Sequence, residues 1–226
     1  MWQEDTKKGS VSNHSEMVDL SFSVDCKELP YDHAYELSSE LIKLIPEIKN
    51  DNRNAIQTLH GPMSGNGWVR ADGENIFLSK RAKLCLRVRK DHADKIREIE
   101  GKKIKLFGND LNIGKSKMKS FLTVRDLFCR FVSCDEDLPE ENFLEEVQAE
   151  LRAFKVNINK ALCGQSKRIS FGEKTLYTRS LMIADLSKEE AVILQEEGVG
   201  KHRLFGCGIF LPHKSIDAVS NFKEDD

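Results

Sequence analysis

Residues 18–24, VDLSFSV, alternate between apolar and polar side chains. Side chains of a β-strand point to opposite faces in turn, so this alternation predicts a half-buried strand. Leu29 and Pro30 then open a segment with apolar residues at helical spacing, which predicts a helix that ends at Pro46. The apolar face of that helix consists of Ala34, Leu37, Leu41, Leu44 and Ile45.

The order of elements continues in the same manner and then repeats. Strand-like runs, a short helix and a hairpin complete the first half, at residues 55–60, 76–78, 83–88, 91–100 and 104–113. The second half contains strands at 126–133, 167–171, 175–183 and 204–211, a helix from Pro139, and a helix capped by Ser187 and Glu190. Each half reads β-α-β-β-α-β, which predicts an α+β protein with two tandem ferredoxin-like (RRM-like) domains and antiparallel sheets.

Two units of about 100 residues account for the 226 residues of the chain. We expect a flexible tail over residues 1–16 and an N-terminal ferredoxin-like domain over 17–122. A C-terminal ferredoxin-like domain with a glycine-rich loop is expected over 123–212, followed by an acidic tail over 213–226.

The composition is that of a globular protein, with 39% hydrophobic and 32% charged residues. No apolar run approaches the roughly 20 residues that a membrane helix needs, and residues 1–16 lack the apolar core of a secretory signal. None of the six cysteines forms a C-x-x-C pair, which argues against a zinc ribbon. We therefore expect a cytoplasmic protein with reduced cysteines, no membrane partner, no metal and no cofactor.

The net charge of −2 hides a strong asymmetry. Residues 80–130 contain sixteen Lys and Arg against six Asp and Glu, whereas the remaining residues are acidic overall. Such a basic stripe is typical of a surface that binds a polyanion, although a solvated charged face is the alternative. The candidates for binding RNA are Lys80, Arg81, Lys83, Arg87 and Arg89.

Residues 198–210, GVGKHRLFGCGIF, contain four glycines within eleven residues: Gly198, Gly200, Gly206 and Gly208. Glycine lets a backbone approach a bulky ligand closely, and exposed amides together with Lys201 and Arg203 could hold a phosphodiester. A tight helix-to-strand turn, followed by a glycine-bearing strand under a packed helix, is the alternative. The segment matches neither the P-loop nor the dinucleotide-binding pattern.

This loop resembles that of the CRISPR-associated endoribonucleases that cut precursor CRISPR RNA within its repeats. Residues 18–22 (VDLSF), 30–35 (PYDHAY) and 184–187 (ADLS) fit the same family, most closely its MYXAN variety. The family belongs to the repeat-associated RNA-binding superfamily with tandem ferredoxin-like domains. The resemblance spans roughly residues 17–212.

The resemblance implies metal-independent cleavage by the 2′-hydroxyl group, which leaves 2′,3′-cyclic phosphate and 5′-hydroxyl ends. It implies CRISPR repeat RNA as the partner, both the precursor and the mature crRNA. It also implies that the protein can stay bound to the cleaved hairpin and join other subunits of an effector complex.

Such a reaction needs a base, an acid and a cation, and histidine suits the first two roles. The family places its catalytic histidine in the first helix, so the resemblance makes His33 the first candidate. His202 is either the second proton-transfer group or a phosphate contact. Tyr35 and Tyr31 either orient a group, stack on a base or pack at an edge. His60 is a weaker, loop-lining candidate, and His14, His92 and His213 are expected in tails or on the surface.

A non-catalytic RNA-binding subunit with the same fold is the second hypothesis, and a ferredoxin-like small-molecule regulator is the third. The nuclease hypothesis requires one physical arrangement. The imidazole of the first helix and the glycine-rich turn near the C-terminus must meet at a single site.

Overall fold

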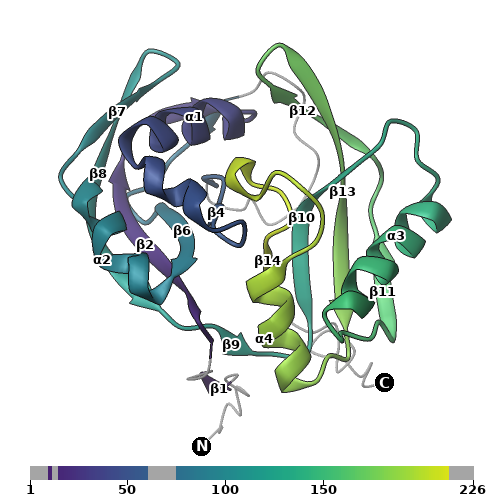
Figure 1. Cartoon of the computed structure of the whole chain (residues 1–226). Coiled ribbons are helices and arrows are strands. Elements are labelled where there is room, and N and C mark those ends of the chain that lie inside the picture. Colours follow the sequence, from purple (N-terminus) through teal and green to yellow (C-terminus); the bar gives the residue numbers. More distant parts are fainter. Residues whose placement is uncertain (1–9, 12–14, 61–74, 214–226) are drawn as a thin grey trace, which may run out of the picture.

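The computed structural model describes residues 10–11, 15–60 and 75–213. Two lobes are visible in Figure 1, and residues 188–208, which precede the last strand of the second lobe, lie between them. Within the described ranges, no helix is long and apolar enough to cross a membrane.

The N-terminal lobe is built on a five-stranded antiparallel sheet with β2 (Met17–Asp25) at its centre. Helix α1 (Ala34–Leu44) covers one face, together with the short helix α2 (Ala93–Ile96). The strand order β4-β6-β2-β8 is the ferredoxin-like order, and β7 adds an edge strand. These strands are β4 (Ala55–Ile56), β6 (Lys83–Arg89), β7 (Lys103–Leu106) and β8 (Asn109–Lys119).

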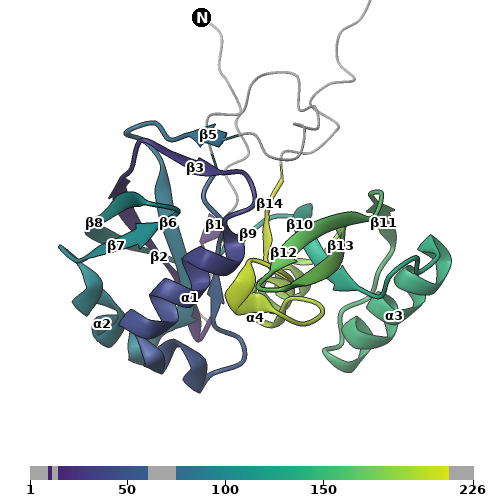
Figure 2. The same ribbon diagram turned by 90° about the horizontal axis from the view of Figure 1, so that it is seen from above.

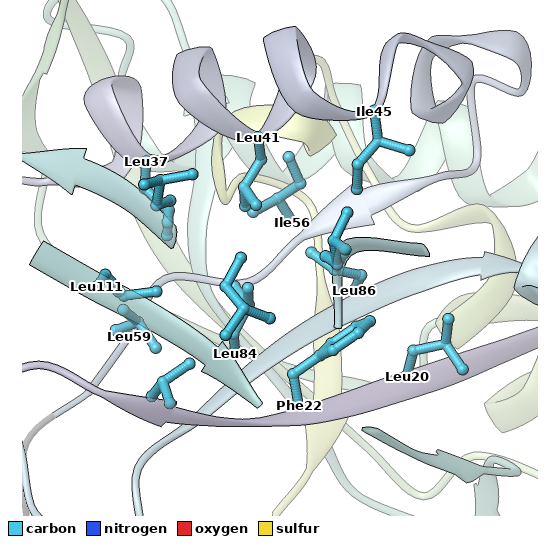
Figure 3. Packing of buried hydrophobic residues seen from close by; sticks show 14 of the residues in the cluster. Leu20, Phe22, Leu37, Leu41, Ile45, Ile56, Leu59, Leu84, Leu86 and Leu111 are labelled. Atoms are coloured by element: carbon cyan, nitrogen blue, oxygen red, sulfur yellow. The ribbon is translucent and has the colours of Figure 1, made fainter. Parts of the chain in front are cut away.

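The alternation at residues 18–24 places Leu20 and Phe22 on the side of the sheet that faces α1. Figure 3 shows Leu37, Leu41 and Ile45 of α1 above these side chains. All five are buried, and each such side chain contributes roughly 1.5–3 kcal/mol relative to exposure. The apolar stripe of the first helix therefore docks it on the sheet.

The C-terminal lobe repeats the plan with β10 (Leu127–Cys134) in the central position. Its strand order β11-β13-β10-β14 is again ferredoxin-like, and β12 also pairs with β13. Two helices pack on this sheet, α3 (Glu140–Ala153) and α4 (Lys188–Glu197). The other strands are β11 (Lys160–Cys163), β12 (Lys167–Phe171), β13 (Lys174–Ala184) and β14 (Phe210–Pro212). The predicted fold class is confirmed in both lobes.

Two small ladders complete the described structure. β3 (Glu28–Pro30) pairs with β5 (Asn75–Phe77), and β1 (Ser10–Val11) pairs with β9 (Leu122–Thr123). The predicted capping box is present, because the Ser187 side chain accepts from the Glu190 amide and the Glu190 carboxylate accepts from the Ser187 amide. Helix α4 ends at Gly198, as expected.

Several predicted boundaries are wrong. α1 begins at Ala34 rather than near Pro30, because residues 28–30 pair with β5. The expected helix at 91–100 is α2 between two 3₁₀ turns, η2 (Lys90–His92) and η3 (Arg97–Ile99). Residues 10–11 form a strand and not part of a flexible tail.

The last strand was predicted at residues 204–211, but it is the shorter β14, which begins at Phe210. Residues 203–205 form the 3₁₀ turn η4 (Arg203–Phe205), and Gly206 and Gly208 have positive φ angles, which lie outside the range of a regular β-strand. Strand β11 was not predicted at all. The expectations for residues 1–9, the loop at 61–67, and residues 214–226 lie outside the described residues.

Candidate active site between the two domains

The glycine-rich loop (residues 198–208) packs against the N-terminal domain. Gly206 has a φ of 86°, and a Cβ there would lie 2.8 Å from Thr58 Cγ2 and 3.9 Å from Ala34 Cβ. Glycine at this position therefore allows η4 to approach both the start of α1 and the segment after β4. In Figure 2 this loop and α4 occupy the space between the lobes.

Four rings form an aromatic cluster at the same place: Tyr35, Phe171, His202 and Phe205. Tyr35 of α1 stacks on Phe205 of η4, with 5.6 Å between ring centroids and 16° between ring planes. Phe171 of β12 lies edge-on to both, at 5.3 Å and 4.8 Å. His202 contacts Phe171 at 4.8 Å. Three elements from the two domains thus hold Tyr35 and His202 around one apolar centre.

The turn between β12 and β13 rests on the start of α1. The Ser170 amide donates a hydrogen bond of 2.6 Å to Asp32 Oδ2. A Cβ on Gly172 would lie 3.0 Å from the hydroxyl of Tyr35. This hairpin also carries the exposed cations Lys167, Arg168 and Lys174.

His33 directly precedes α1 and is 2% exposed. Its Nε2 atom accepts a hydrogen bond of 3.0 Å from the Leu59 amide, so the ring proton must be on Nδ1. Nδ1–H then donates to Pro30 O at 2.8 Å. Burial lowers the pKa of His33 and keeps the ring neutral near pH 7. Both ring nitrogens of His33 therefore bond to backbone groups, and the ring is shielded from solvent.

His202 is the more accessible imidazole of the predicted pair, since it is half-buried in the loop. Its φ is 66°, and this left-handed backbone turns the chain into η4. Partial burial, with a smaller effect from the Lys201 charge, lowers the pKa of His202. Among the described residues, no group hydrogen-bonds to its ring nitrogens, so His202 can exchange a proton with a ligand.

His60 lies beside this site, with Nε2 3.3 Å from Thr58 Oγ1. Its surface is exposed, yet surrounding protein lowers its pKa to about 4, with added effects of the Arg130 and His33 charges. Arg130 of β10 brings a cation from the C-terminal domain toward it.

The predicted RNA contacts divide into accessible and inaccessible groups. Lys80, Arg81, Lys83 and Lys201 are exposed, and Arg89 is partly exposed in a 2.7 Å ion pair with Asp91. Tyr31 is half-buried and packs against the N-terminal core.

Arg87 is 0% exposed, and this corrects its assignment to RNA. Its guanidinium binds the carboxylate of Asp19 and donates to Gln195 O and Phe210 O in the other domain. Arg87 therefore joins the two domains and is not available to a phosphate.

The glycine-rich loop also differs from the expected phosphate cradle. The Gly200 amide donates to both carboxylate oxygens of Glu150 at 3.0 Å, and the Lys201 amide donates to Ser133 Oγ at 3.0 Å. Gly198, Gly208 and Arg203 are buried. The alternative interpretation, a packed helix-to-strand turn, describes these positions, and of the two predicted cations only Lys201 faces solvent.

Sequence reasoning did not single out Phe171, Phe205, Arg130 or Glu150. Phe205 lies within the glycine-rich segment, so its position in the sequence could have identified it as a candidate site residue. Nothing in the local sequence marks Arg130 or Glu150, because their roles depend on segments from elsewhere in the chain.

Two ferredoxin-like sheets joined around a glycine-rich loop define a tandem ferredoxin-like protein. A model of one such family, described as Cas6 Crispr, matches residues 18–215. The chain belongs to the Cas6 family, and the resemblance seen in the sequence is confirmed.

Individual relatives agree with this assignment. The chain is 27% identical over 195 residues to the CRISPR-associated endonuclease Cas6 of Myxococcus xanthus (strain DK1622), covering 86% of this chain and 81% of that protein. A solved CRISPR-associated protein Cas6 superposes with a TM-score of 0.63 at 14% identity, covering 88% of this chain and 100% of the other. A Cas6-related protein from Pyrococcus furiosus superposes with a TM-score of 0.61 at 14% identity, covering 86% and 98%. Both superpositions support the fold.

Proposed function

We propose that this protein is an endoribonuclease that processes CRISPR RNA by cutting precursor transcripts within their repeats, without a metal ion. Membership of the Cas6 family and the similarity to a Cas6 endonuclease support this activity. The observation that carries the proposal is the aromatic cluster, in which Tyr35 of the first domain and His202 of the second both contact the ring of Phe171.

The proposed reaction is in-line attack by the 2′-hydroxyl on the adjacent phosphorus, which leaves a 2′,3′-cyclic phosphate and a 5′-hydroxyl. His202 exchanges a proton with the RNA, since its ring is accessible and its lowered pKa favours the neutral form near pH 7. Lys201 provides positive charge for the phosphorane. Tyr35 orients the ribose-phosphate through its hydroxyl.

His33 is the second candidate for proton transfer. Its Nε2 lone pair already faces a hydrogen-bond donor, the Leu59 amide. In the proposed reactive state this bond opens and a ribose hydroxyl replaces the amide as the donor. A neutral imidazole with Nδ1–H held by Pro30 O is in the protonation state that a general base needs.

The proposed RNA path includes the exposed cations of the N-terminal domain. Lys83 pairs in register with Ser23, and Lys117 with Ser21, so both lysines lie on the sheet face opposite Leu20 and Phe22. Lys80 and Arg81 precede this strand and are exposed. These cations would neutralise phosphates of the repeat and hold the mature crRNA, with other effector subunits as further partners.

The test is incubation of the purified protein with cognate repeat RNA in EDTA. We expect one discrete cut and an upstream fragment ending in a cyclic phosphate, which resists phosphatase until acid opens it. His202→Ala should reduce the cleavage rate by about 100-fold or more while RNA affinity changes little. His92→Ala is the matched control, since this histidine lies beside α2 on the far side of the first lobe (Figure 1) and should leave both quantities unchanged.

A non-catalytic RNA-binding subunit remains the second candidate function. One observation favours it: both ring nitrogens of His33 are occupied by backbone groups. Tight, salt-dependent binding of repeat RNA by the wild-type protein without any cleavage would establish this alternative and reject the nuclease.

A further inference from the structure

Arg203 is the most completely bonded side chain of the glycine-rich loop. It is 7% exposed, and all five of its N–H groups have acceptors. Nη1 donates to Glu197 O at 2.6 Å and to Gly208 O at 3.0 Å. Nη2 donates to Glu196 O and Arg53 O, both at 2.9 Å, and Nε donates to Arg53 O at 3.2 Å.

These acceptors connect three separate parts of the fold. Glu196 and Glu197 form the last turn of α4, and Gly208 lies at the far end of the loop. Arg53 belongs to the N-terminal domain, just before β4. One guanidinium therefore closes the loop on itself and attaches it to the other domain.

One loop glycine, Gly198, leaves room for this guanidinium, and a second, Gly208, leaves room for the backbone of Val199. A Cβ on Gly198 would overlap Arg203 Nη1 and Gly208 O, and a Cβ on Gly208 would overlap Val199 O. Both residues also have positive φ angles, 68° and 66°. The glycine pattern that suggested a phosphate cradle thus leaves room for a buried arginine.

The charge of Arg203 is satisfied by backbone dipoles. Burial lowers its pKa, to about 10, so it stays protonated at neutral pH. Removal of the guanidinium would leave four buried or half-buried carbonyls without their donor. The loop geometry therefore depends on it.

We propose that Arg203 is a positioning residue that does not contact RNA: it clamps the glycine-rich loop so that Phe205 is held against Tyr35 of α1 and His202 against Phe171 of β12. The consequence for cleavage rests on the proposed nuclease function. The clamp itself does not, so the two can be tested apart.

The experiment compares Arg203→Met with Lys201→Met, which is the same substitution two residues away at an exposed cation. Loss of one phosphate contact reduces the slope of log K against log salt by about 0.7–0.9. We expect this reduction for Lys201→Met and an unchanged slope for Arg203→Met. Cleavage at saturating RNA should fall by roughly 10- to 100-fold in Arg203→Met, as when a catalytic group shifts by about an ångström.

If Arg203→Met does not fold, Arg203→Lys tests the same proposal. A lysine can contact a phosphate but cannot bridge four carbonyls, so we expect no rescue of cleavage. Hydrogen exchange of amides 198–208, measured without RNA, should be faster in the lysine variant than in wild type.

Wild-type rates of exchange and cleavage in Arg203→Lys, or a reduced salt slope in Arg203→Met, would overturn the clamp. If the wild-type protein does not cleave RNA, the nuclease proposal is rejected. The hydrogen-exchange and salt-dependence measurements still test whether Arg203 clamps the loop.

Discussion

At the residue scale, tertiary contacts determine the tautomer and the protonation state of His33. The Leu59 amide is 26 residues away in sequence, yet it determines which ring nitrogen of His33 carries the proton. Burial then lowers the pKa of the ring. The imidazole that the sequence resemblance made the first catalytic candidate is therefore neutral and hydrogen-bonded to the backbone in this structure.

This environment predicts a pH dependence of stability. Below about pH 6.5 the unfolded chain protonates His33, whereas the folded protein resists protonation, so the free energy of unfolding should fall as the pH drops. His33→Gln removes this titration and should give a shallower decline below about pH 6.5. Urea unfolding at several pH values measures the slope. Equal slopes in His33→Gln and wild type would contradict the assignment.

At the scale of elements, a glycine of the glycine-rich loop is required for two reasons: close packing by another segment and a positive φ angle. Gly206 needs freedom from a side chain because Thr58 of the other domain packs against it, and it also has a positive φ. Gly108, in the turn between β7 and β8, has a φ of 81°, and no atom lies within 4 Å of the place that a Cβ would occupy. Substitutions at the two positions can therefore be compared to distinguish the effect of backbone strain from the effect of the inter-domain contact.

We predict that Gly206→Ala destabilises the protein more than Gly108→Ala. Both substitutions incur about 1–2 kcal/mol of left-handed strain, and only Gly206→Ala adds a close contact with Thr58 Cγ2, which pushes η4 away from the segment after β4. Gly206→Ala should also slow cleavage, because His202 and Phe205 belong to the displaced segment. Urea unfolding and cleavage rates give the comparison, and an equal loss of stability in both variants would refute the inter-domain contact.

For the whole molecule, buried arginines connect the two domains. Arg87 joins β2 and β6 to the end of α4 and to β14, while Arg203 joins the loop to Arg53. Arg87 also lies 4.4 Å from the centroid of the Phe121 ring, in the segment between the two sheets. The domains therefore share hydrogen bonds as well as apolar contacts, and we expect them to unfold together.

Arg87→Ala tests this coupling. The substitution leaves Asp19 without its buried partner and should cost about 3–5 kcal/mol, with the single thermal transition separating into two. Arg89→Ala on the same strand removes an exposed pair with Asp91 and should cost no more than about 1 kcal/mol. Calorimetry distinguishes the two, and a single unshifted transition in Arg87→Ala would argue against the coupling.

Local patterns were enough to predict the fold and several of its boundaries. The alternation at residues 18–24, the apolar stripe of α1 and the Ser187–Glu190 capping box each act within a few residues, so neighbouring side chains reveal them. The element order and the resemblance at the two ends of the chain then indicated the family.

Only the tertiary structure decided which polar groups are free to meet a ligand. Arg87 and Arg89 stand two residues apart on one strand, yet one is buried between domains and the other reaches solvent. Arg203 and Lys201 differ in the same way within one loop. A charge pattern shows where cations occur along the chain, but whether each is exposed depends on surfaces that distant segments cover when the chain folds.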